Sequence, residues 1–167
     1  MTDRATSQID DLLRNAERYS RVFTAGKLPT PPALKLAIVA CMDSRIDLFA
    51  VLGLHLGEAH MIRNAGGLIT EDALRSLTLS QSLLGTRDIM VIQHTGCGLQ
   101  GKEERLRGRV TEQTGVDPPW PLGAFEDIEA SVREQLAILR AAPHLMGNDR
   151  ARGFVYAVET GSLREVI

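Results

Sequence analysis

The alternation of short apolar segments with amphipathic ones is the feature that most limits how this chain can fold. Three segments have the apolar character of buried strands, at residues 34–40 (LKLAIVA), 59–63 (AHMIR) and 88–93 (DIMVIQ). Helical periodicity is present between them, at residues 46–54 and 70–84. Because short strands that alternate with helices indicate βαβ units, we predict an α/β fold with a mostly parallel central sheet flanked by helices.

Outside this central region the sequence predicts two further amphipathic helices and a hairpin. The first helix covers about residues 6–23, with Thr6 or Ser7 as its N-cap. The second carries apolar residues at helical spacing and ends before Pro143; these residues are Phe125, Ile128, Val132, Leu136 and Leu139. Residues 153–159 and 163–166 are expected to form the hairpin, which adds an antiparallel edge strand. Residues 100–109 are expected to be a solvated helix or loop, and 117–121 a rigid connector.

Composition excludes several classes of protein. A chain of 167 residues, with 44% hydrophobic and 24% charged residues, has the size and balance of a single globular domain spanning 1–167. The formal net charge of −2 and the lack of a basic stripe argue against a nucleic-acid partner. No apolar run approaches the roughly 20 residues that cross a bilayer, and residues 1–20 are too polar for a secretory signal. We therefore expect a cytoplasmic protein without a membrane partner.

Soft metal ligands follow two of the predicted strands. Cys41 comes directly after the first strand, and His94 and Cys97 follow the third. In parallel sheets, ligands bind beyond the carboxyl ends of the strands, so these three side chains are expected on one side of the sheet. Two thiolates and one imidazole suit Zn²⁺, and three protein ligands leave a fourth position for water, which is the catalytic pattern.

Two other interpretations of these residues stay open on spacing alone. The cysteines could be buried small side chains beside a surface histidine. Either cysteine could instead be a nucleophilic or redox-active thiol, although the sequence has no CxxC motif. Two cysteines are in any case too few for a disulfide framework.

Asp43 and Arg45 follow Cys41 at alternate positions. The Asp43 carboxylate is placed to reach the metal or its bound water, and Arg45 can hold it through a bidentate pair. The alternative is that Asp43 or Ser44 caps the following helix while Arg45 is solvated. In the segment 63–67, the backbone could offer N–H groups to an anion such as bicarbonate, or the glycines could simply make a tight turn.

Three segments in a fixed order resemble the β-class carbonic anhydrases: Ala40-Cys41-Met42-Asp43-Ser44-Arg45, Arg63-Asn64-Ala65-Gly66 and His94-Thr95-Gly96-Cys97-Gly98. The resemblance runs from about residue 34 to the C-terminal hairpin, and it is closest to the short prokaryotic branch. It implies that Cys41, His94 and Cys97 bind one Zn²⁺ per subunit and that Asp43 and Arg45 form the catalytic dyad. It also implies a homodimer, or a tetramer built from dimers, in which the N-terminal helix packs on the partner subunit.

The resulting hypothesis is an enzyme, a carbonic anhydrase, that hydrates carbon dioxide reversibly to bicarbonate with a hydroxide on zinc. Because two thiolates offset the charge of the metal, the Asp43 carboxylate is expected to assist by accepting a hydrogen bond from that hydroxide. A carbonyl sulfide or carbon disulfide hydrolase that uses the same zinc site is the alternative enzyme. A zinc- or bicarbonate-binding module without turnover is the alternative outside catalysis. His55 and His60 are either proton carriers or ordinary surface or core histidines, and His144 is expected to be structural.

Overall fold

One five-stranded sheet organises the chain. The computed structural model describes residues 7–167, apart from the side chain of Asn148. The strand order is β2-β1-β3-β4-β5, and all neighbouring pairs are parallel except β4 and β5. This confirms the predicted sheet and its antiparallel C-terminal edge strand. The strands are β1 (Leu36–Cys41), β2 (Ala59–Asn64), β3 (Asp88–His94), β4 (Ala151–Tyr156) and β5 (Leu163–Val166).

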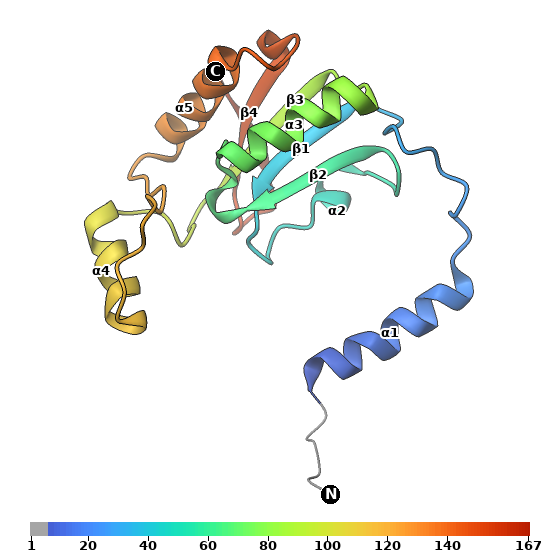
Figure 1. The fold of residues 1–167 in the computed structure, drawn as a ribbon, viewed down its shortest axis with the longest axis horizontal. Coiled ribbons are helices and arrows are strands. Elements are labelled where there is room, and N and C mark those ends of the chain that lie inside the picture. Colours follow the sequence, from blue (N-terminus) through green and yellow to red (C-terminus); the bar gives the residue numbers. More distant parts are fainter. Residues whose placement is uncertain (1–6) are drawn as a thin grey trace, which may run out of the picture.

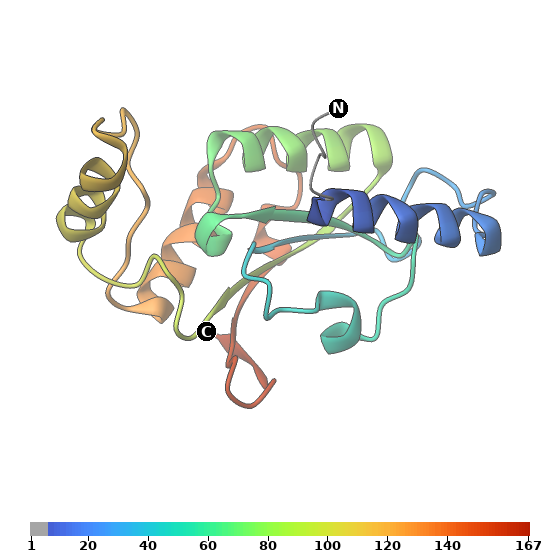
Figure 2. The same ribbon diagram turned by 90° about the horizontal axis from the view of Figure 1, so that it is seen from below.

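The helices cover both faces of the sheet (Figures 1 and 2). Figure 2 shows α3 above the sheet and α2 below it. One apolar cluster joins α3 and α5 to Ala37, Val39 and Val91, and a second joins α2 to Ile38 and Ile92 on the opposite face. The helices are α1 (Gln8–Val22), α2 (Leu48–Leu52), α3 (Glu71–Leu84), α4 (Glu103–Thr114) and α5 (Ile128–Ala141), with short 3₁₀ turns η1 (Ala65–Gly67) and η2 (Asn148–Arg150).

Several boundaries differ from the sequence-based prediction for local reasons. The first strand begins at Leu36 and not at residue 34, because Lys35 has a positive φ of 53° that extended backbone does not allow. Strand β4 begins earlier than predicted, at Ala151. It also ends earlier, at Tyr156, because the carbonyl of Ala157 accepts hydrogen bonds from Thr160 and Gly161 and so starts the turn. The segment predicted as a solvated helix or loop is helix α4, which continues until Gly115.

The helix predicted over 46–54 is reduced to α2, and its N-cap is not the one expected. The side chain of Asp47 accepts a hydrogen bond from the backbone N–H of Ala50 at 3.2 Å and caps the helix. The prediction that Asp43 or Ser44 provides this cap was therefore wrong. Because Asp47 fills the capping role, the Asp43 carboxylate is left for other contacts.

Helix α1 stands apart from the rest of the subunit (Figure 1). Ser7 and Asp10 form a capping box at its start, while the alternative cap, Thr6, lies outside the described residues. None of the helical residues is buried, although the predicted apolar face is present. Within residues 7–167, no helix combines the length and apolar character needed to cross a bilayer.

Candidate metal centre

Strands β1 and β3 end side by side at the carboxyl edge of the sheet, and each supplies metal-ligating side chains there. Cys41 is the last residue of β1 and His94 is the last residue of β3. Cys97 lies in the turn that follows β3. Because β1 and β3 pair in parallel, the structure brings together the three residues that the sequence predicted as ligands.

The three donor atoms form a compact set. The two cysteine sulfurs and a ring nitrogen of His94 all lie within 4.8 Å of one another, and the two sulfurs are 4.0 Å apart. Both thiols are free and all three residues are buried. Two sulfurs bound to one tetrahedral Zn²⁺ at 2.3 Å each are about 3.8 Å apart, so this spacing fits a shared zinc ion.

The imidazole of His94 is oriented for coordination. Its Nδ1 lies 2.9 Å from the carbonyl oxygen of Thr95, and because a carbonyl can only accept, Nδ1 carries the proton. The unprotonated Nε2 is buried and has no hydrogen-bond partner among the described residues. A buried nitrogen without a partner is costly, and coordination to a metal removes that cost.

The two thiols titrate as a coupled pair. The hydrogen bond between the two sulfurs lowers the pKa of Cys41 to about 4, against the burial that raises it. The same contact raises the pKa of Cys97, because its proton is shared with the neighbouring sulfur. Metal coordination requires deprotonated sulfur, and the charge of a divalent cation compensates two thiolates. The pair therefore suits a metal better than it suits a single reactive thiol.

Asp43 and Arg45 form the bidentate pair that the sequence predicted. The Arg45 Nε and Nη2 groups donate to the two carboxylate oxygens of Asp43 at 2.9 and 2.8 Å. These hydrogen bonds hold the pKa of Asp43 well below its usual range. Arg45 also donates to the carbonyl of Gly96 at 3.1 Å, which ties the pair to the loop between His94 and Cys97. The Asp43 Oδ2 atom lies 3.6 Å from the Nε2 of His94, so the carboxylate borders the donor set.

Arg63 supports the loop after β1, a role that the sequence reasoning missed. Its guanidinium donates to the carbonyls of Cys41 at 2.7 Å, Asp43 at 2.8 Å and Ile46 at 3.3 Å. The partners lie at the end of β1 and in the loop after it, 17 to 22 residues away in sequence. No local pattern in the sequence points to such contacts.

The turn after β2 is structural in its contacts. The side chain of Asn64 exchanges two hydrogen bonds with the backbone of Leu68, at 2.8 and 2.9 Å. Gly67 has a φ of 63°, and a Cβ there would lie 2.7 Å from the carbonyl oxygen of Ile92 and 2.8 Å from the nitrogen of Cys41. This agrees with the tight-turn interpretation of residues 63–67, and it places Gly67 tightly against both β1 and β3.

Thr95 fixes the loop that carries His94 and Cys97. Its backbone N–H donates to the carbonyl of Tyr156 at 3.0 Å, and its hydroxyl donates to Glu159 at 2.7 Å. The hydroxyl also accepts from the N–H of Val158 at 3.1 Å. The β4–β5 hairpin thus holds the metal loop, a role for Thr95 and Glu159 that the sequence reasoning also missed.

The other histidines lie outside the donor set. His60 is near the start of β2 and its Nδ1 lies 2.7 Å from the hydroxyl of Ser80. His55 is exposed and lies 3.5 Å from Glu58, and His144 is exposed beyond α5. The structure therefore brings none of the three into the cluster formed by Cys41, His94 and Cys97.

Comparison with known proteins places the chain in a family. The family model described as carbonic anhydrase matches residues 36–117. β-Carbonic anhydrase 1 of Mycobacterium tuberculosis (strain ATCC 25618 / H37Rv) is 43% identical over 158 residues, which cover 94% of this chain and 96% of the relative. The chain belongs to the β-carbonic anhydrases. The resemblance noted in the three sequence motifs is thereby confirmed.

Further relatives agree with this family. A crystal structure of carbonic anhydrase from Streptococcus mutans matches with a TM-score of 0.92 at 38% identity, covering 97% of this chain and 99% of that one. Carbon disulfide hydrolase of Acidithiobacillus thiooxidans is 30% identical over 169 residues, covering 89% of this chain and 85% of the relative. As a β-carbonic anhydrase, the chain is a zinc enzyme that catalyses the reversible hydration of carbon dioxide to bicarbonate.

Proposed function

We propose that Cys41, His94 and Cys97 hold the catalytic zinc, one ion per subunit, and that Asp43 and Arg45 are the catalytic dyad. The observation that carries this proposal is the buried, unpartnered Nε2 of His94 within 4.8 Å of two free thiols. Three protein ligands leave one corner of a tetrahedral ion for solvent. Bound zinc supplies a Lewis acid that lowers the pKa of a coordinated water, so that the water becomes a nucleophile near neutral pH.

In this proposal Asp43 orients the attacking oxygen. Because Arg45 keeps the carboxylate ionised, Asp43 can accept a hydrogen bond and cannot donate one. Its Oδ2 faces the donor set, 3.6 Å from the Nε2 of His94, which places an acceptor beside the open corner. With zinc bound by the three ligands, Asp43 would accept a hydrogen bond from a zinc-bound O–H group and so orient its oxygen toward carbon dioxide. Such positioning of a nucleophile is a large part of catalysis in hydration reactions.

Arg45 has a second task, which is to hold Asp43 away from the metal. Its guanidinium donates hydrogen bonds to both carboxylate oxygens and to the carbonyl of Gly96. The overall reaction adds the oxygen of one water to the carbon of carbon dioxide, giving bicarbonate and one proton. The side chain of Asp43 is 18% exposed and that of Arg45 is 52% exposed, so solvent reaches this side of the site and offers a route for that proton.

Replacement of one ligand tests the assignment. We expect Cys41→Ala to lose zinc and carbon dioxide hydration together, because only two of the three protein ligands would remain. Metal content and stopped-flow hydration would be measured on the same sample, with His144→Ala, a change of an exposed residue outside the donor set, as the matched control. Hydration retained by a zinc-loaded Cys41→Ala enzyme would refute the role of this cysteine.

Carbon disulfide or carbonyl sulfide hydrolysis is the second candidate activity. The 30% identity to a carbon disulfide hydrolase favours testing it, since both substrates are linear and cumulated like carbon dioxide. The same enzyme sample would be assayed for sulfide release from each substrate. We expect hydration of carbon dioxide to be much faster, because the identity to β-carbonic anhydrase 1 is higher, at 43%. Because both relatives are named as enzymes, they also favour catalysis over the alternative of a zinc- or bicarbonate-binding module without turnover.

We further propose that the whole chain is one domain that works as a homodimer, or as a tetramer of dimers, with α1 packed on the partner subunit. The apolar side of α1 includes Ile9, Leu12 and Leu13, which are 66%, 63% and 58% exposed in the single subunit. An amphipathic helix gains most of its stability from packing its apolar face, and within residues 7–167 no residue of this helix is buried. A second copy of the chain supplies the missing surface.

A cytoplasmic location is our proposal for the same molecule. Its two free thiols are only 4.0 Å apart, and both must stay reduced to serve as metal ligands. A reducing compartment protects such a pair from disulfide formation.

A further inference from the structure

Cationic residues precede three neighbouring strands of the sheet. Lys35 comes directly before β1, Arg87 directly before β3 and Arg150 directly before β4. These strands are adjacent and parallel, so the three residues lie together at the amino edge of the sheet. The backbone N–H of Arg87 donates to the carbonyl of Lys35 at 2.7 Å, which fixes two of the three positions relative to each other. Strands of this length separate the amino edge from the metal-ligating carboxyl edge by about 20 Å.

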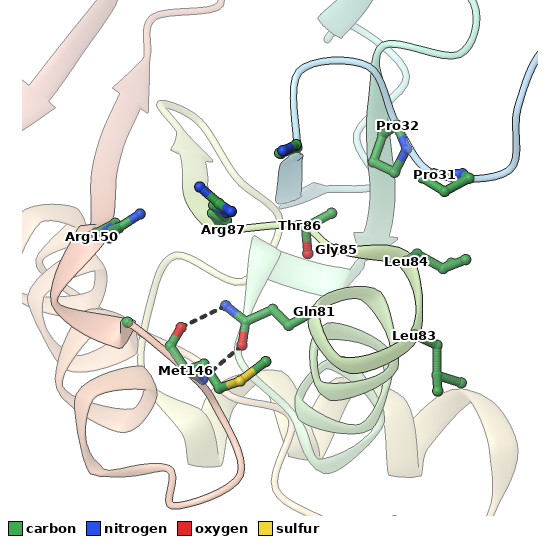
Figure 3. Close-up of a pocket in the computed structure, with 12 residues that line it drawn as sticks. Pro31, Pro32, Gln81, Leu83, Leu84, Gly85, Thr86, Arg87, Met146 and Arg150 are labelled. Carbon is green, nitrogen blue, oxygen red and sulfur yellow. Dashed lines mark hydrogen bonds between the residues drawn. The ribbon is translucent and has the colours of Figure 1, made fainter.

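A cavity of about 570 Å³ opens at this amino edge, and all three cations line it. Its volume falls in the range of small-molecule sites. Figure 3 shows Arg87 and Arg150 on one side of the cavity, and Pro31, Leu83 and Leu84 on the other. One wall is therefore positively charged and the other is apolar.

No acidic residue lines this cavity among the residues that the structure describes. Asp88 and Asp149 are neighbours of Arg87 and Arg150 in sequence, but neither contributes to the lining. Within residues 7–167, the side chains of the three cations form no hydrogen bond or ion pair. One carboxylate lies at the rim, since the Oδ1 of Asp149 and the Nε of Arg150 are each 3.8 Å from the place of a Cβ on Gly147. The three cations outnumber it, so the cavity is positively charged in a chain whose formal net charge is −2. An anion placed between them would relieve their mutual repulsion.

The uncharged polar groups of the cavity are already occupied. Gln81 exchanges hydrogen bonds of 3.0 and 2.9 Å with the backbone of Met146 (Figure 3). The hydroxyl of Thr86 lies 2.7 Å from that of Ser80 and is paired with it. The three cations are consequently the side chains left to recognise a polar ligand, and they select negative charge.

We propose that this cavity binds an organic phosphate ester. Arg87 and Arg150 contact the phosphate group, for which the planar guanidinium is well matched, and Lys35 adds a third positive charge. The apolar wall formed by the prolines and leucines packs against the organic part of the ligand. Nothing in this proposal depends on the metal or on the hydration reaction, since the cavity lies at the opposite edge of the sheet.

Calorimetric titration of the zinc-loaded enzyme with adenosine 5′-monophosphate, adenosine and inorganic phosphate tests the proposal. We expect the monophosphate to bind with one site per subunit, adenosine not to bind, and inorganic phosphate to bind more weakly than the monophosphate. The double variant Arg87→Gln/Arg150→Gln should weaken binding of the monophosphate by more than about tenfold, because each charged hydrogen-bonded contact is strong. Amide NMR shifts should change at Thr86 and Arg87 and stay constant at Gly96 in the metal loop.

The matched control is Arg105→Gln/Arg109→Gln on α4, which removes the same charge from exposed residues outside the cavity. An equal loss of binding in this control would show a general effect of charge and would overturn the site. No binding to the wild type, or shifts confined to the metal loop, would overturn it as well. Inorganic phosphate that binds as tightly as the monophosphate would overturn the role given to the apolar wall.

Discussion

Arg45 alone decides where the carboxylate of Asp43 points. It holds both carboxylate oxygens, while the nearest donor-set atom, the Nε2 of His94, lies 3.6 Å away. Removing the guanidinium leaves an ionised carboxylate beside a site that attracts a cation. The backbone N–H at position 45 still donates to the Oδ1 of Asp43 at 2.9 Å, but the Oδ2 loses its partner and can turn toward the metal, into the position meant for solvent.

We therefore predict that Arg45→Ala lowers the rate of carbon dioxide hydration by about 10- to 100-fold, the usual effect of losing a residue that orients a group beside a metal. A crystal structure of the zinc-loaded variant should show Asp43 coordinated to the ion. Arg152→Ala is the control, since Arg152 also forms a bidentate pair, with Glu165, but away from the site. An Arg45→Ala structure with Asp43 unmoved and solvent on the metal would contradict this role.

At the level of residues, the sequence predicts the three metal ligands better than the residues that hold the surrounding loops in place. Cys41, His94 and Cys97 are readable because each follows a strand, and the carboxyl ends of parallel strands meet. Arg63 and Glu159 are not readable, because their partners lie 17 or more residues away and become neighbours only through the sheet and the hairpin. The cap of the short helix α2 was mispredicted because several polar residues precede that helix, and only its exact start selects Asp47.

At the level of elements, the carboxylate of Glu103 helps to join α4 to the chain that returns from it, together with Arg107 and Thr111, which bond to residues 117 and 120. Glu103, in the first turn of α4, accepts hydrogen bonds from the N–H groups of Leu122 at 2.6 Å and Ala124 at 3.0 Å. Both hydrogen bonds lower the pKa of Glu103, and the one from Ala124 lowers it more. Only Leu106 is buried within α4, so this contact is a substantial part of what holds the helix in place.

We predict that Glu103→Gln lowers the free energy of unfolding by about 1–2 kcal/mol at pH 7, because the amide has one acceptor oxygen for two N–H donors. The pKa of Glu103 is lower in the folded state, so its stabilising effect is complete above the unfolded pKa of about 4.3 and is lost as the pH falls below it. The difference between wild type and variant in urea unfolding should thus shrink between about pH 5 and pH 3.

Glu104→Gln provides the control for this prediction, because Glu104 is an exposed neighbour on the same helix. We expect it to change the free energy of unfolding little at either pH. A difference between Glu103→Gln and wild type that stays constant from pH 5 to pH 3 would exclude the carboxylate as its source.

The elements themselves were largely predictable. Strands β1, β2 and β3 appear as apolar runs, and α3 lies between Thr70 and Gly85, which the structure uses as its caps. Their ends were harder to predict, because they depend on single backbone conformations. Because Lys35 has a positive φ, β1 begins only after it, and a lysine side chain does not indicate such a conformation.

At the level of the whole molecule, α1 is the part whose stability the single subunit does not explain. We predict that the wild type sediments as a dimer or larger assembly, and that Leu12→Asp/Leu13→Asp weakens self-association. Burial of a leucine contributes about 1.5–3 kcal/mol, so losing two of them should raise the dissociation constant by at least about 100-fold. Analytical ultracentrifugation over a range of concentrations measures this constant.

Glu17→Gln, on the polar side of α1, is the matched control and should associate like the wild type. A wild-type chain that remains monomeric at micromolar concentrations would contradict the proposed dimer. Self-association that is unchanged in the double leucine variant would show that α1 does not contribute to the interface. The sequence revealed the apolar face of this helix, but a pattern within one chain does not identify what covers that face.

Gly67 limits which residues the turn after β2 can contain. A Cβ at this position would lie 2.7 Å from the carbonyl oxygen of Ile92 and 2.8 Å from the nitrogen of Cys41, so even alanine would push the turn away from β1 and β3 or distort those strands just before their ends. Those ends carry Cys41 and His94, whereas Gly67 follows the end of β2 by three residues. A substitution in a turn that supplies no ligand would thereby disturb the positions of two ligands.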